Sequence, residues 1–86
     1  MPRYFFHTED GRIRRDAEAL ELDGIRDART EALKTVGQMM ELKPDEFWDD
    51  GCYRMTVTDD TGLILLIIDL STAQSVVTGP AGPLGP

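Results

Sequence analysis

The sequence has few cysteines, histidines and positively charged residues, and these shortages argue against particular classes of protein. Cys52 is the only cysteine of 86 residues, so no disulfide can form within the chain, which argues against a secreted disulfide scaffold. Nine Lys and Arg against 16 Asp and Glu give a net charge of −7. Nucleic-acid phosphates repel such a chain, so we expect no nucleic-acid partner.

A long apolar run is also missing. The longest, Leu63–Ile68, has six branched aliphatic residues, whereas a membrane-spanning helix needs about 20. The first residues, Met1-Pro2-Arg3-Tyr4, lack the apolar segment of a signal peptide. These absences predict a cytoplasmic protein without a membrane partner.

The same apolar run is the most informative stretch present. A strand with no polar face needs cover on both sides, and the remaining sequence supplies one amphipathic helix, enough for one side. A chain of this length also buries only a small core, so its stability is marginal, and dimerisation commonly adds the missing stability. We therefore expect association, either as a homodimer or with another protein.

The first part of the chain predicts a β-hairpin. Arg3–Thr8 is aromatic-rich, and Asp10-Gly11 suits a two-residue turn that would pair Thr8 with Ile13. Ile13 would then face the core together with Tyr4, Phe6 and Thr8, while Phe5 and His7 would share the other face with Arg14.

A helix is predicted from Ile25 to about Glu41, capped by Asp23 or Gly24 and ended by Lys43-Pro44. Its apolar positions recur at three- and four-residue steps: Ile25, Ala28, Ala32, Leu33, Val36, Met39 and Met40. Asp45–Gly51 is read as a connection whose aromatic pair, Phe47 and Trp48, folds back on the core edge.

Cys52–Asp59 alternates as a half-buried strand, and Asp59-Asp60-Thr61-Gly62 predicts a type I turn into a last strand. Pairing Asp59 with Leu63 would turn Leu63, Leu65 and Ile67 toward the helix. The opposite, uncovered face is the predicted interface, and its residues are Phe5, His7, Arg54, Ile64, Leu66 and Ile68.

Together these elements predict a single α+β domain over residues 1–73, a four-stranded, mainly antiparallel sheet in the order β-β-α-β-β with one helix on one face. The Gly- and Pro-rich residues 74–86 are predicted to be a disordered tail.

The opening Pro2-Arg3-Tyr4-Phe5-Phe6-His7 resembles that of a family of short bacterial proteins catalogued as a domain of unknown function. Glu21-Leu22, Ala28-Arg29, Glu31-Ala32, Phe47-Trp48 and Val57-Thr58-Asp59 with Gly62 continue the likeness over about residues 1–73. Ala19 stands where the family pattern suggests a glycine. The resemblance implies the β-β-α-β-β fold and supplies no catalytic residue.

Four features invite a functional interpretation, and each has a plainer one. Asp60-Thr61-Gly62 spells an aspartic-protease triplet with unsuitable flanks, so we read it as a turn. His7, as a base or metal ligand, needs partners such as Asp59 or Glu9, which nothing brings near. Cys52 lies near acidic residues, whose negative charge disfavours the reactive thiolate form. The acids of Asp45–Gly51 lack the spacing of a calcium loop, so we expect no metal and no cofactor.

The sequence therefore predicts a non-enzymatic protein-interaction module, homodimeric and regulatory. Two alternatives stay open: an antitoxin-like acidic protein that neutralises a basic partner, and a small enzyme that uses His7 or the Asp59/Asp60 turn.

Overall fold

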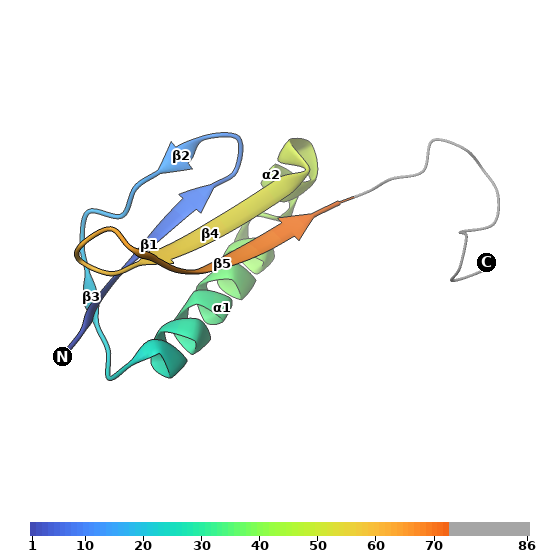
Figure 1. The fold of residues 1–86 in the computed structure, drawn as a ribbon. Coiled ribbons are helices and arrows are strands. Elements are labelled where there is room, and N and C mark those ends of the chain that lie inside the picture. The colour runs from blue at the N-terminus through green and yellow to red at the C-terminus, as the bar shows by residue number, and fades with distance from the viewer. Residues whose placement is uncertain (73–86) are drawn as a thin grey trace, which may run out of the picture.

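A computed structural model describes residues 1–72 of the chain, so the predicted tail lies outside the described residues (Figure 1). The elements are, in order, β1 (Arg3–Glu9), β2 (Ile13–Arg14), β3 (Leu20–Glu21), α1 (Ile25–Leu42), α2 (Pro44–Asp50), β4 (Cys52–Thr58) and β5 (Ile64–Ser71). The fold is α+β with an antiparallel sheet, as predicted, but with five strands and two helices instead of four and one.

The sheet runs in the order β2-β1-β4-β5, and α1 crosses one of its faces (Figure 1). The added strand β3 pairs with the start of β1, through Arg3 with Glu21 and Tyr4 with Leu20. The short β2 pairs with the end of β1. The two short strands thus follow one another along the edge of β1 that β4 does not occupy.

The added helix α2 replaces the predicted connection. Pro44 occupies its first turn with Asp45 and Glu46, and Gly51 ends it in the left-handed conformation at φ 76°. Proline and acids at the start of a helix and glycine at its end are favourable terminal residues, and they were visible in the sequence. Phe47 packs against the core as expected, whereas Trp48 is exposed.

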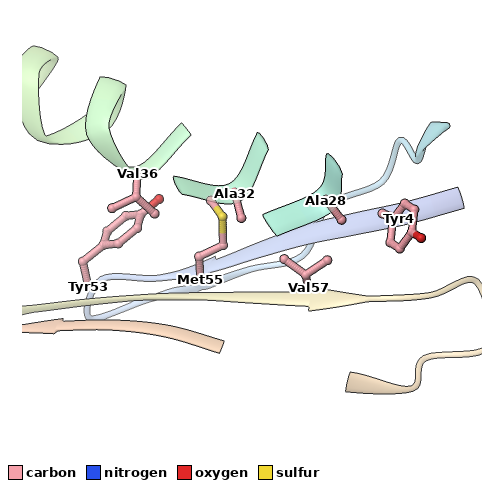
Figure 2. Close-up of a cluster of buried hydrophobic side chains, with 7 residues drawn as sticks. All are labelled: Tyr4, Ala28, Ala32, Val36, Tyr53, Met55 and Val57. Atoms are coloured by element: carbon pink, nitrogen blue, oxygen red, sulfur yellow. The ribbon is translucent and has the colours of Figure 1, made fainter. Parts of the chain in front are cut away.

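The core lies between α1 and the middle of the sheet. Ala28, Ala32 and Val36 are one helical turn apart and meet side chains of β1 and β4, namely Tyr4, Tyr53, Met55 and Val57 (Figure 2). The helix begins at Ile25 as predicted and ends one residue beyond the predicted end. Ile25 and Leu33, which the sequence pattern places on the apolar side of the helix, are exposed.

The predicted register of the first hairpin is wrong by one residue. Glu9 pairs with Ile13 and Thr8 with Arg14, so three residues form the loop, with Gly11 at φ 91°. A one-residue slip moves every side chain to the other face, and Ile13 is 69% exposed instead of facing the core.

The register of β5 is also corrected, by a bulge after the turn. Thr58 pairs with Ile64 and Val57 pairs with Leu66, so Leu65 is an extra residue. Leu66 and Ile68 therefore lie opposite the buried Val57 and Met55, on the helix side, and Ile67 is turned away. The prediction that Leu66 and Ile68 lie on the uncovered face is wrong.

The charge of Asp69 explains the bulge. Without the extra residue, Asp69 would lie opposite Tyr53 on the helix-covered face, where an unpaired carboxylate is costly. With it, Asp69 lies opposite Arg54 and accepts hydrogen bonds from that guanidinium at 2.8 and 3.1 Å. Leu70 takes the place opposite Tyr53.

Candidate functional site

Two surface regions of the described residues are candidate sites. One is the outer edge of β5, and the other is the uncovered face of the sheet around His7. β5 is the last strand of the sheet and pairs only with β4 among residues 1–72. One row of its backbone N–H and C=O groups is therefore left without a strand partner over eight residues.

The side chains along this edge are almost all aliphatic. Ile64 and Ile67 are 56% and 49% exposed, and Asp69 is the only charged residue of β5. Beside the edge, a groove of about 540 Å³ separates β5 from α1 and is lined by Leu66, Ile67, Ile68 and the helix residues Arg26, Arg29, Thr30 and Leu33. The groove thus has an aliphatic wall from β5 and, from α1, a wall in which Leu33 lies among two arginines and a threonine.

Four of the six predicted interface residues do lie on the uncovered face. Phe5, His7 and Arg54 alternate with core residues of β1 and β4, and Ile64 pairs with Thr58 on that face. Ile67 takes the place given to Leu66 and Ile68. The face therefore carries less aliphatic surface than predicted, and its Phe5 ring stacks on His7 at 6.2 Å between centroids.

His7 has two partners that the sequence did not suggest. Its Nδ1 accepts a hydrogen bond from the backbone N–H of Asp16 at 2.9 Å, and its Nε2 lies 3.1 Å from the hydroxyl of Thr58. The Asp16 carboxylate in turn accepts the N–H of Phe6 at 3.1 Å and that of Glu18 at 3.2 Å. We call Asp16, His7 and Thr58 the His7 cluster.

The His7 cluster closes a gap in the sheet. Along the edge of β1, β3 pairs at residues 3–4 and β2 at residues 8–9, which leaves Phe6 between them without a strand neighbour on that side. Asp16, in the connection from β2 to β3, supplies the acceptor for the Phe6 N–H. A side chain thus completes the pairing that two short strands leave open.

The direction of these hydrogen bonds fixes the tautomer of His7. A backbone N–H can only donate, so Nδ1 must carry a lone pair and the ring proton of neutral His7 lies on Nε2. Nε2–H then donates to the oxygen of Thr58. A base that activates a hydroxyl needs the opposite arrangement, with an unprotonated nitrogen toward the hydroxyl.

The Asp59–Gly62 turn is held together by its own carboxylate. Asp59 Oδ1 accepts the Thr61 hydroxyl at 2.6 Å and the N–H groups of Thr61 and Leu63 at 2.9 and 3.0 Å. The Thr61 hydroxyl lowers the pKa of Asp59, helped by the backbone N–H groups and opposed by desolvation. These contacts and Gly62, at φ 88°, agree with the predicted turn.

The remaining candidates are scattered. Cys52 is exposed at the start of β4, and in residues 1–72 no three metal-ligating side chains gather closely enough to hold an ion.

The hydroxyl of Tyr53 is buried without a hydrogen-bond partner in that part of the chain. Burial raises the pKa of Tyr53, with Asp10 adding to the effect and Arg14 opposing it.

A small hollow lies beside the His7 cluster on the uncovered face. It has a volume of about 300 Å³ and is lined by His7, Arg15, Thr56, Thr58, Gly62 and Ile64. Thr58 itself is only 7% exposed, and it lines the hollow together with Arg15 and a second threonine, Thr56.

The sequence pattern of one protein family matches residues 3–71, nearly the whole described chain. The chain belongs to the domain-of-unknown-function family DUF6894. The predicted resemblance is confirmed at the level of the family, and the DUF6894 match ends where β5 ends. No curated protein and no solved structure matches the chain. Within residues 1–72, neither helix combines the length and apolar character needed to span a membrane.

Proposed function

We propose that this DUF6894 chain is a non-enzymatic protein-interaction module that forms a homodimer by antiparallel pairing of β5 with β5 of a second copy. The observation that carries the proposal is the open edge of β5, eight residues long and almost wholly aliphatic. A regulatory role would be exercised through this association.

The chemistry of the edge supports pairing with another strand. Natural edge strands are protected by lysine, proline, bulges within the exposed stretch or a covering segment. Within the described residues 1–72, β5 has no such feature from Leu66 to Ser71 except Asp69, whose charge is paired with Arg54. An open aliphatic edge of this kind is a site of strand addition or of aggregation.

The dimensions favour a second copy as the occupant. Eight residues extend for roughly 27 Å, so two antiparallel β5 strands would form a continuous sheet around a twofold axis. Both α1 helices would then lie on the same face of that sheet. Leu33 and the aliphatic wall of the groove on the helix side, and Ile67 on the opposite face, would add apolar area to the backbone pairing, toward the roughly 1,200–2,000 Å² of a stable interface.

The absence of catalysis is part of the same proposal and is supported by two observations. His7 directs a proton toward Thr58 and cannot accept one from it in this tautomer. The oxygen of Asp59 that faces the turn is occupied by three donors. We therefore propose no catalytic residue and no cofactor.

Sedimentation velocity over a range of concentrations tests the dimer. Wild type should sediment as a dimer at high micromolar concentration, and Ile67→Lys should sediment as a monomer, because a lysine at the centre of the β5 edge opposes a second lysine across the axis. Ile67 is half exposed, so this variant should keep the urea midpoint of the monomer.

Leu63→Lys is the matched control. Leu63 is 62% exposed, against 49% for Ile67, but it precedes β5 in the turn, so its lysine should leave the dimer intact. A wild type that remains monomeric at high concentration, or a dimer that Ile67→Lys does not weaken, would contradict the proposal.

A further inference from the structure

We propose that the hollow beside the His7 cluster binds a small oxyanion, the carboxylate or phosphate group of a small molecule. The hollow joins Arg15 to the hydroxyl groups of Thr56 and Thr58, a donor set suited to oxyanions and poor in acceptors. This site is separate from the β5 edge, and its argument does not depend on the homodimer.

The direction of the hydrogen bonds in the His7 cluster makes Thr58 a donor toward the hollow. The Asp16 N–H donates to Nδ1 of His7, so Nε2–H donates to the Thr58 oxygen. The hydroxyl proton of Thr58 must therefore point elsewhere, and no acceptor for it is found among residues 1–72. Because Thr58 lines the hollow, its free proton is available to a ligand there.

Arg15 supplies the positive charge. The only ion pair among residues 1–72 joins Arg54 to Asp69, so the guanidinium of Arg15 is not neutralised by a carboxylate in that part of the chain. A guanidinium and an adjacent hydroxyl donate to two oxygens of the same anion.

The carboxylates nearest in sequence do not oppose this arrangement strongly. Asp16 accepts the N–H groups of Phe6 and Glu18, and Asp59 accepts three donors of its own turn. Their negative charge is thus partly balanced by donors outside the hollow. Ile64 and Gly62 form an apolar side of the hollow that fits the carbon part of the ligand.

Titration of the ¹⁵N-labelled chain with sodium acetate and, separately, sodium phosphate tests the proposal by NMR at constant pH and constant ionic strength set with sodium chloride. The amide signals of Arg15 and Thr58 should shift saturably with at least one anion, at a Kd in the millimolar range, about 1–10 mM. Acetate and phosphate separate the carboxylate from the phosphate as the group recognised.

Variants then distinguish a built site from general attraction. Arg15→Gln and Thr58→Val should each weaken binding about tenfold, the effect of one charge-assisted hydrogen bond. Thr58→Ser keeps the hydroxyl and should bind like wild type. Arg12→Gln is the charge-matched control, because Arg12 lines a different hollow, and it should change nothing.

Arg15 is exposed, so Arg15→Gln keeps the test valid even if Thr58→Val disturbs the fold. Absence of a saturable shift with both anions up to roughly 50 mM would overturn the proposal. So would equal weakening by Arg15→Gln and Arg12→Gln, since only the net charge would then matter.

Discussion

The two long edges of the sheet, along β1 and β5, both present backbone N–H and C=O groups that need hydrogen-bond partners, and they differ in how these groups are covered. The outer edge of β1 is covered within the chain by β2 and β3 (Figure 1). Between these two strands, the Asp16 carboxylate accepts the N–H of Phe6. The outer edge of β5 has no cover in residues 1–72 and consists of aliphatic residues except for Asp69 and Ser71. One edge is closed with polar groups, and the other is open and apolar.

The difference between the two edges is the reason for placing the proposed association at β5. The β1 edge uses charged and short elements, Ile13–Arg14 and Leu20–Glu21, whose pairing satisfies the backbone without presenting a long template. The β5 edge is long and uninterrupted after its bulge. This contrast between a protected edge and an aliphatic one supports the proposed addition of a strand at β5.

The two faces of β5 provide the largest test of this comparison. Ile68 lies opposite Met55 on the helix side and Ile67 lies half exposed on the other, although the two residues are identical and adjacent. Ile68→Ala should lower the free energy of unfolding by about 2–3 kcal/mol, the lower part of the range for buried isoleucine because Ile68 is only partly buried. Ile67→Ala should cost less than about 0.5 kcal/mol in the monomer.

Urea denaturation at low protein concentration measures both variants without a contribution from association. Equal losses would mean that neither face of β5 is packed as described. A larger loss for Ile67→Ala than for Ile68→Ala would show that the bulge at Leu65 is absent and that the simple register is correct.

The closed edge gives the next largest effect. Asp16→Ala removes the acceptors of the Phe6 and Glu18 N–H groups, so it should lower the free energy of unfolding by about 1–2 kcal/mol. Asp23→Ala is the control, because Asp23 is exposed and makes no hydrogen bond in the described residues. Hydrogen exchange should locate the change at the Phe6 amide, and unaltered protection there would contradict the role assigned to Asp16.

Much of the fold was readable from local signals. The period of the helix, the glycine of the Asp59–Gly62 turn and the alternation of Cys52–Thr58 depend on neighbouring residues, and all three predictions are confirmed. Helix α2 also had a local signal in Pro44 and Gly51, but the aromatic pair within it was interpreted as part of a loop.

Register was harder because it depends on residues far apart in sequence. The bulge at Leu65 follows from the need to keep Asp69 out of the core, and Asp69 lies four residues beyond it. The one signal in the sequence was the position of Asp69, which the simple register would place on the same face as the core residues of β5. The His7 cluster had no such signal, since His7, Asp16 and Thr58 are brought together only by the pairing of β1 with β4 and by the loop between β2 and β3.

The smallest expected effect concerns the ion pair that positions Asp69. The hydrogen bonds from Arg54 hold the pKa of Asp69 below its ordinary value of 3.8, and the same contact raises the pKa of Arg54. A lowered carboxyl pKa in the folded state stabilises the fold above the unfolded value, and this stabilisation is lost as the pH falls through the folded value. Asp69→Asn should therefore lower the urea midpoint slightly at pH 7, and this difference should shrink as the pH falls below the ordinary carboxyl value and through the lower folded-state pKa of Asp69.

The effect must be small because both side chains are about half exposed, at 47% and 57%, and water and salt screen the pair. High salt should reduce the difference between wild type and Asp69→Asn at pH 7. A difference that persists at acid pH or in high salt would mean that Asp69 contributes through packing at the open edge instead of through charge. The same variant should dimerise at least as tightly as wild type, because it removes the only charge of β5.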